Sequence, residues 1–248
     1  MTLKLKAPHG IPGRILAIDT SSRAGVVVVA DLPAGQFHSL TITPGLTHGR
    51  ELVPTIKHIL QNAGLTFSHL DAIAVGIGPG SYTGLRVGMA VAKTVAEVVD
   101  KPCLAIDSLL LPVLNLPEHE THAVSIADAQ RGAIYEAVYQ KPNPGGPWHC
   151  IQPPCIRPWT DINRWANVPE AVITGPGLVL SGKLGNPQVR TASEEIWSPN
   201  HLAIQCLLSE YLDHCPEVDR HQIEPLYIRP SAAEEKRQEQ LSNNASFA

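Results

Sequence analysis

Apolar positions divide the chain into predicted strands and helices. Near its start, "RILAIDTSS", "GVVVVAD" and "QFHSLTI" are apolar or alternating runs of the length and composition typical of strands. "HGRELVPTIKHILQNAG" instead repeats apolar residues at helical spacing and ends at a glycine, which predicts a helix at about 48–63. The chain continues with a predicted strand in "LDAIAVGIG", a second helix from Thr83 to Val99 and a further strand in "KPCLAIDS".

This order of elements then begins again. Three strands, a helix, a strand, a helix and a strand resemble half of a ribonuclease-H or actin-like unit. "HAVSIADAQRGAIYEAVYQ" is a predicted hairpin whose first strand ends in Asp128, much as the first strand of the chain ends in Asp19. We therefore predict an α/β protein with a duplicated ribonuclease-H-like (actin-like ATPase, ASKHA) fold, in which two small lobes have mixed sheets flanked by helices. The alternative is that aspartate ends both strands only because it favours turns.

The predicted repeat also gives the expected organisation of the chain. It comprises an N-terminal extension at 1–13, an N-terminal lobe at 14–115, a C-terminal lobe at 116–230 and a disordered tail at 231–248. "KPNPGGPWHCIQPPCIRP" is predicted to be a surface connection because of its prolines. Ser198 and Pro199 are expected to begin a last helix that reaches about Leu212 and packs back on the first lobe.

Composition excludes several classes of protein. The 248 residues are 44% hydrophobic and 17% charged, as in ordinary globular proteins, and no apolar run is long enough to span a membrane. The five cysteines are scattered, which argues against a disulfide framework and fits a cytoplasmic location. A net charge of −4 argues against a free-standing nucleic-acid-binding protein.

The glycine-rich segment before the second helix lacks both common phosphate-binding patterns. Leu85 stands where a P-loop requires lysine, and Ser81 where a dinucleotide-binding loop requires glycine. Gly78-Pro79-Gly80 instead fits a type II turn. Gly84 and Gly88 would let the following helix lie very close to a neighbouring segment. We therefore interpret this turn as mainly structural.

The second predicted helix is apolar around more than half of its circumference, whereas a surface helix normally has one apolar face. It has a charged stripe and two apolar stripes: Arg86, Lys93 and Glu97; Val87, Val91, Val95 and Val98; Leu85, Met89, Ala92, Ala96 and Val99. One interpretation is a helix buried on both sides within its own chain. The other is a helix with one side on its own sheet and the other on a second protein.

Four segments, taken in order, resemble the TsaB family, also called YeaZ. They are "ILAIDTSS", "GIGPGSYTGLRVG", "IADAQRGAIY" and "EPLYIR", and the resemblance spans about residues 14–230. The most characteristic family motif comprises Gly78, Pro79, Gly80, Ser81, Tyr82, Thr83, Gly84 and Arg86. Tyr82 replaces the usual phenylalanine of the family, and "DAQRG" displaces an arginine.

The resemblance implies a role in the synthesis of threonylcarbamoyladenosine, beside the anticodon of tRNAs that read ANN codons. It implies a non-catalytic partner or scaffold subunit that pairs directly with its paralogue TsaD, which carries the metal and the active site. The ATPase TsaE joins them, and tRNA would be contacted only indirectly. The implied interface lies on the two predicted helices, and its candidate residues are Leu52, Ile56, Ile59, Val87, Met89, Val91, Val95 and Val98. No intrinsic cofactor is implied; ATP and Mg²⁺ would bind only in the assembled complex, and a homodimer is an option without the partner.

Two enzyme classes remain as alternatives. An actin-fold ATPase or phosphotransferase usually has D-x-G-[ST] in its first hairpin, whereas this chain has Asp19-Thr20-Ser21-Ser22. Asp19, Thr20, Ser21 and Asp128 are the candidate nucleotide and magnesium ligands, although the same side chains could simply satisfy a tight turn. A glycoprotease-like peptidase would need histidines spaced as in H-E-x-x-H, and His119-Glu120-Thr121-His122 lacks that spacing. The sequence therefore predicts no catalytic residue and no metal ligand.

Overall fold

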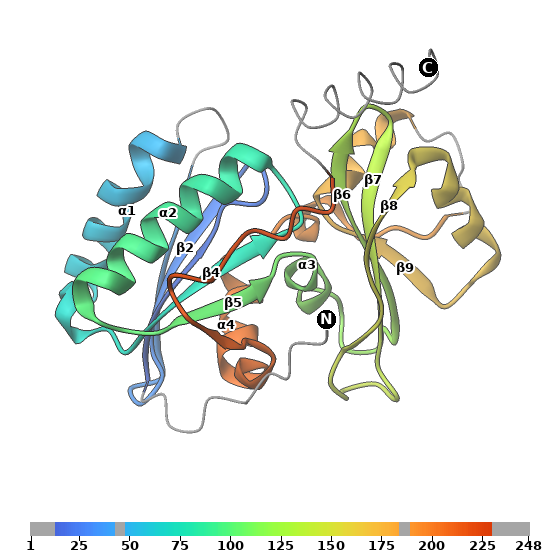
Figure 1. Ribbon diagram of the computed structural model, residues 1–248. Coiled ribbons are helices and arrows are strands. Elements are labelled where there is room, and N and C mark those ends of the chain that lie inside the picture. Colours follow the sequence, from blue (N-terminus) through green and yellow to red (C-terminus); the bar gives the residue numbers. More distant parts are fainter. Residues whose placement is uncertain (1–12, 43–47, 184–188, 230–248) are drawn as a thin grey trace, which may run out of the picture.

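The computed structural model describes residues 13–42, 48–183 and 189–229, which form two lobes side by side (Figure 1). The predicted tail at 231–248, and all of the predicted extension except Gly13, lie outside these residues. Each lobe is built on one mixed sheet.

In the described part of the chain, the first lobe has a six-stranded sheet in the order β10-β5-β4-β1-β2-β3. Its strands are β1 (Arg14–Asp19), β2 (Gly25–Asp31), β3 (Gln36–Ile42), β4 (Ala72–Gly78), β5 (Cys103–Asp107) and β10 (Glu217–Val218). β1 is buried on both faces, since Ile15 and Ala17 pack into one core cluster while Leu16 and Ile18 pack into another. That explains why this strand is an unbroken apolar run.

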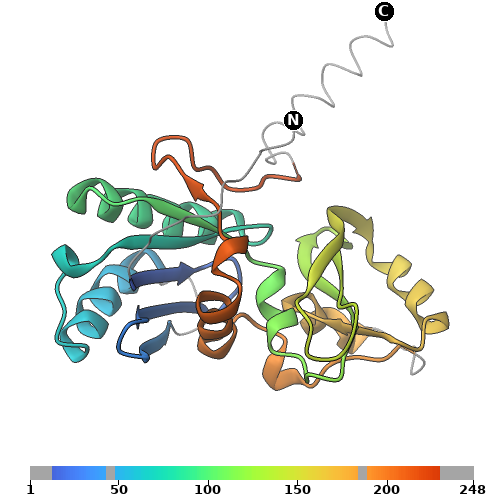
Figure 2. The same ribbon diagram turned by 90° about the horizontal axis from the view of Figure 1, so that it is seen from below.

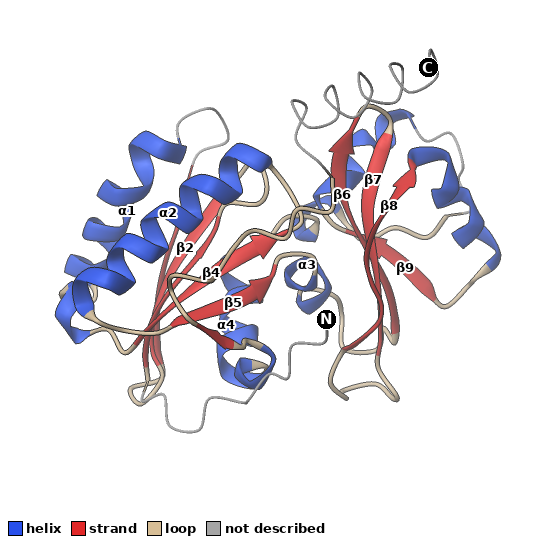
Figure 3. Ribbon diagram, viewed as in Figure 1, coloured by secondary structure: helices blue, strands red, loops and turns tan. Residues whose placement is uncertain are grey.

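Helices cover both faces of the first sheet (Figure 3). α1 (His48–Asn62) and α2 (Tyr82–Val99) lie on one face, where they share a core with the sheet. α3 (Leu110–Leu114) and α4 (His201–Glu210) lie on the opposite face. The expected stop at Gly64 is confirmed, because its φ is +66° and the Leu65 amide donates to the Leu60 carbonyl at 2.9 Å.

Short 3-10 helices complete the connections. They are η1 (Phe67–His69), η2 (Trp159–Asn167), η3 (Pro176–Lys183), η4 (Glu194–Ile196) and η5 (Leu212–His214). No helix among the described residues is long and apolar enough to cross a membrane.

The second lobe repeats the topology of the first. Its strands are β6 (His122–Gln130), β7 (Ala133–Gln140), β8 (His149–Pro158) and β9 (Ala171–Thr174), in the order β8-β7-β6-β9. β6 is antiparallel to β7 and parallel to β9, as β1 is antiparallel to β2 and parallel to β4. The outer strands β3 and β8 are likewise both antiparallel to their neighbours. The predicted duplication is therefore confirmed.

The two lobes share a core. Side chains of β1 and β2 belong to the same buried cluster as side chains of β6 and β7, and α3 and α4 contribute to it. α3 lies between the lobes (Figure 2). A separate cluster fills the outer face of the second sheet, against η2 and η3.

The proline-rich segment was predicted to be a surface connection, and this prediction is wrong for its second half, which forms β8. β8 tolerates prolines because it is the edge strand of its sheet, where backbone donors on one side have no ladder partner. Its pairing with β7 also shifts where Gln152 opposes Val138 and Cys155 opposes Glu136, so Pro153 and Pro154 lie in a bulge.

The start of the last helix was predicted incorrectly. Asn200, rather than Ser198, caps α4, and its Oδ1 accepts a hydrogen bond from the Ala203 amide at 2.9 Å. Asparagine caps as well as serine does, and the extended backbone of Asn200 is suited to a cap. The expected packing of this helix on the first lobe is confirmed by its contacts with β2 and β3.

Candidate functional site

The glycine-rich turn lies directly on the first hairpin. The Ser81 amide donates to the Ser21 carbonyl at 2.7 Å, and the Thr20 hydroxyl donates to the Gly84 carbonyl at 2.8 Å. A β-carbon on Gly80 would lie 2.3 Å from the Ser21 carbonyl oxygen. The glycines are therefore needed for close approach to protein backbone, as the structural interpretation of the turn requires.

The turn is not of type II. The positive φ of +100° belongs to Gly78 instead of Gly80, and the Gly78–Pro79 peptide bond is cis. Ser81 caps α2, because its hydroxyl accepts from the Gly84 amide at 3.2 Å. The sequence pattern fits both kinds of turn, since proline and glycine occur in each.

Asp19 is fully buried at the end of β1 and its oxygens are occupied by protein donors. One oxygen accepts from the amide and the hydroxyl of Ser21 at 2.9 and 2.6 Å, and the other accepts from the Ser108 hydroxyl at 2.7 Å. A β-carbon on Gly76 would lie 2.0 Å from the second oxygen. This geometry fits a satisfied turn better than a magnesium site, because a Mg²⁺ ion that keeps its waters needs room around the carboxylate.

The other candidate ligands do not join Asp19 in one site. Asp128 is exposed, and its Oδ1 accepts from the Gln130 amide at 2.6 Å. Thr20 and Ser21 are buried, with their hydroxyls bonded to Gly84 and Asp19. Within the described residues, no group of three or more histidine, cysteine, aspartate or glutamate side chains could hold a metal ion.

Sequence reasoning missed Asp107, Ser108 and Tyr139. Asp107 lies at the end of β5, and its Oδ2 accepts from the hydroxyl of Tyr139 in the second lobe at 2.5 Å. Burial raises the pKa of Asp107, and the nearby Asp19 raises it further. A signal was present, because "LAIDT" at 16–20 is repeated as "LAIDS" at 104–108. These two strands flank β4, and at their ends they carry a fully buried carboxyl group, Asp19, and a half-buried one, Asp107.

Asp19→Asn should change the pH dependence of stability. Burial raises the pKa of Asp19 above 3.8, against the lowering effect of the hydrogen bonds from Ser21 and Ser108. The protonated carboxyl group of Asp19 therefore favours the folded state. This stabilisation is complete below pH 3.8 and is lost as the pH rises through the higher pKa of the folded state. Asparagine cannot titrate, so the free energy of unfolding of the variant, relative to the wild type, should rise from about pH 4 towards neutrality.

Urea titrations at a series of pH values measure this difference. Asp31→Asn is the matched control, because hydrogen bonding from Arg14 lowers the pKa of Asp31 and the trend should have the opposite sign. The same slope for both variants would contradict the assignment.

The structure divides the predicted interface residues into two groups. Leu52, Ile56, Ile59 and Met89 are at most 4% exposed and lie in the core beneath α1 and α2. Their assignment to a partner interface is wrong, because they already pack against this chain's own sheet.

The other four predicted interface residues line the side of α2 that the sheet does not cover. Val87, Val91 and Val95 are half-buried, and Val98 is 77% exposed. Val53 of α1 is also exposed, and α1 approaches α2 closely enough that a β-carbon on Gly49 would lie 3.9 Å from Val87. We call Val53, Val87, Val91, Val95 and Val98 the valine surface.

The charged stripe of α2 contacts the C-terminal segment of the chain. The Arg86 Nε donates to the Tyr227 hydroxyl at 2.9 Å, and its guanidinium lies 4.2 Å from the ring centre of Tyr82. Further along α2, Glu97 pairs with Arg220 at 2.6 Å. These contacts explain the role of Arg86 in the glycine motif and occupy the polar side of the helix.

Comparisons with known proteins agree with the resemblance. Residues 45–143 match the family described as TsaD: tRNA N6-adenosine threonylcarbamoyltransferase. The tRNA threonylcarbamoyladenosine biosynthesis protein TsaB of Escherichia coli is 30% identical over 138 residues, which is 55% of this chain and 58% of that protein. The TsaB proteins of Haemophilus influenzae and Bacillus subtilis are 36% and 33% identical, over 51% and 56% of their lengths. The chain thus spans about half the length of these curated relatives.

Solved structures extend the likeness over the fold. YeaZ from Pseudomonas aeruginosa matches with a TM-score of 0.72 and 23% identity, over 87% of this chain and 99% of that one. A structure described as an uncharacterized protein with similarity to peptidase YEAZ, also from Pseudomonas aeruginosa, matches with a TM-score of 0.74 and 24% identity, over 88% and 100%. These likenesses show a shared fold. The curated relatives, together with the order of the four sequence segments, support the resemblance of this chain to the TsaB (YeaZ) family.

Proposed function

We propose that this protein is a subunit required for threonylcarbamoylation of the adenosine next to the anticodon in tRNAs that read ANN codons. It acts by pairing with TsaD, and TsaE joins the pair. The names of the curated relatives support the pathway. The match of residues 45–143 to the TsaD family supports a paralogous relationship with the proposed partner.

The observation that carries the proposal is the valine surface. A branched apolar side chain with 77% exposure, Val98, stands beside three half-buried valines and an exposed one on the neighbouring helix. Exposed apolar side chains on neighbouring helices are typical of a protein-protein interaction site. Both helices fall within the segment that matches the TsaD family.

The chemistry of the first hairpin supports a non-catalytic role. An actin-fold ATPase needs free backbone amides around the phosphates, whereas here the Ser21 amide binds Asp19 and the Ser21 carbonyl binds Ser81. We therefore place any ATP and Mg²⁺ in the assembled complex. The five cysteines are free, as expected in the cytoplasm, where we place the complex. Without TsaD, the valine surface would support self-association.

The isolated chain should neither bind tRNA tightly nor hydrolyse ATP. Its net charge of −4 does not favour binding to the phosphate backbone, so only weak, salt-sensitive association is expected. Fluorescence anisotropy with labelled tRNA at physiological ionic strength and a phosphate-release assay measure the two activities. Tight tRNA binding by this chain alone would contradict the scaffold role, and steady ATP turnover would favour the actin-fold enzyme.

A further inference from the structure

The C-terminal segment from Asp219 to Arg229 follows α2 and ends on the second lobe. It leaves the edge of the first sheet after β10, runs alongside α2 and reaches the turn between β6 and β7 (Figures 1 and 2). We call residues 219–229 the strap. The strap contains the "EPLYIR" motif, for which the proposed function gives no role.

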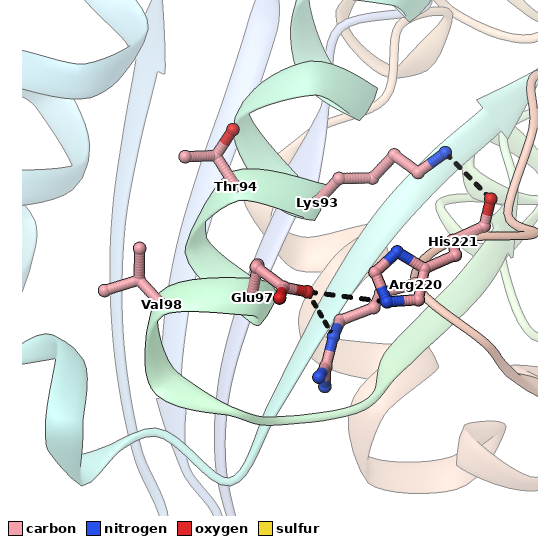
Figure 4. A pocket seen from close by; sticks show the side chains of 6 residues that line it. All are labelled: Lys93, Thr94, Glu97, Val98, Arg220 and His221. Carbon is pink, nitrogen blue, oxygen red and sulfur yellow. Dashed lines mark hydrogen bonds and ion pairs between the residues drawn. The ribbon is translucent and has the colours of Figure 1, made fainter.

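One end of the strap is tied to the C-terminal half of α2. Arg220 pairs through Nε with Glu97 at 2.6 Å and through Nη2 with Asp100 at 3.0 Å. Lys93 donates to the His221 carbonyl at 3.5 Å, and these side chains line a shallow depression beside the helix (Figure 4). Ile223 is only 2% exposed and packs into the core beneath α2. This end is therefore fixed both by charge and by burial.

The middle of the strap is held by the sheet and by the start of α2. The Leu226 amide donates to the Ile77 carbonyl at 2.7 Å. Tyr227 accepts from Arg86 at 2.9 Å, and its ring lies 5.2 Å from that of Tyr82, which Arg86 also contacts. The strap thus contacts both the first turns and the C-terminal half of α2.

The other end of the strap is bonded to the second lobe. Arg229 Nη1 donates to the carbonyl oxygens of Ala129 and Gln130, at 2.6 and 3.1 Å. Gln130 and Arg131 both have positive φ values, 62° and 52°, which side-chain-bearing residues adopt only where surrounding contacts hold them. Arg229 supplies such a contact to this turn.

We propose that the strap mechanically couples α2 to the β6–β7 turn, so that the two ends hold or release together. Its anchors lie on different lobes and share no residue, and the chain between them is bonded at successive points to the first lobe. The strap forms no helix or strand of its own, so its contacts are expected to form cooperatively. Release of the Arg220 end would weaken the intermediate contacts of Ile223, Leu226 and Tyr227 and, through them, the placement of Arg229 and the turn that it holds. This coupling is a property of the isolated chain and does not depend on the proposed function.

Native-state hydrogen exchange on the full chain tests the coupling. The reporter amides are those of Gln130, which donates to Asp128 Oδ1, and Trp159, which donates to the Gly132 carbonyl. Arg220→Ala removes the ion pairs at the distant end, and exchange at both reporters should become about tenfold faster. Arg14→Ala is the matched control, since it removes an arginine pair with Asp31 that joins β1 to β2 and includes no strap residue, and it should leave both rates unchanged.

A double-mutant cycle gives an independent measurement. If the strap acts as one element, the stability losses of Arg220→Ala and Arg229→Ala should be clearly non-additive, because release of either end already frees the other. Unchanged reporter exchange in Arg220→Ala together with additive losses would overturn the proposal. If Arg220→Ala fails to fold, Glu97→Gln weakens the same anchor more gently and is measured in its place, with the same expectation.

Discussion

Gly84→Ala is expected to lower the free energy of unfolding by about 3 kcal/mol or more, although alanine is the better helix former by roughly 1 kcal/mol. Gly84 lies in the first turn of α2, where its missing side chain lets the helix touch the first hairpin. A β-carbon there would lie 2.0 Å from the Thr20 carbonyl oxygen and 3.2 Å from the Ser81 side chain. The helix or the hairpin must move, and the hydrogen bond from Thr20 to the Gly84 carbonyl would be strained or lost.

Urea denaturation of the full chain measures this loss. Gly49→Ala in α1 is the matched control, because the nearest atom to its β-carbon would be Val87 Cγ2 at an ordinary 3.9 Å. That variant should be neutral or gain a few tenths of a kcal/mol. Equal effects at the two glycines would show that the turn and the hairpin are not in the close contact described above.

Val98→Glu should weaken pairing with TsaD by about tenfold or more, because a carboxylate would be buried without a partner in an apolar interface. Val98 is the most suitable position, since at 77% exposure it can be changed without disturbing the core. Val91 and Val95 are half-buried against that core, so charge there would also threaten folding. Isothermal titration calorimetry with purified TsaD measures the dissociation constant.

Two further variants make this result specific. Val98→Lys suits the negative end of the helix dipole, whereas glutamate opposes it, so a loss of pairing shared by both variants cannot come from the dipole. Val179→Glu introduces the same charge at a 59% exposed valine of η3 in the second lobe and should pair normally. Normal pairing by both Val98 variants would mean that the valine surface is not the interface.

Most of the first lobe could be predicted because its local signals agree with one another. β1 and β2 are apolar runs buried on both faces, and α1 and α2 carry clear helical periodicity with a glycine stop or a serine cap. The match between "RILAID" and "HAVSIAD" predicted the duplication because both strands begin a hairpin at the centre of a sheet. β8 was missed because two prolines normally argue against a strand, and only its position at the sheet edge makes them acceptable.

The candidate site was less predictable because it depends on contacts between distant segments. Arg86 and Tyr227 are 141 positions apart, and no local pattern shows that the C-terminal segment returns along α2. Periodicity likewise identified the two apolar stripes of α2, but it could not tell which of them faces the sheet. The interface that the family resemblance implied included Leu52 and Met89, whereas both lie in the chain's own core.

The most direct test of the central claim is a tRNA modification assay with purified TsaD, TsaE, ATP, a threonylcarbamoyl donor and an ANN-reading tRNA. The account predicts sustained formation of threonylcarbamoyladenosine when this chain is added and little or none without it. It also predicts that Val98→Glu reduces the yield in proportion to its loss of pairing, while Val179→Glu does not. Full modification in the absence of this chain, or no modification in its presence while TsaD and TsaE are active with another TsaB protein, would contradict it.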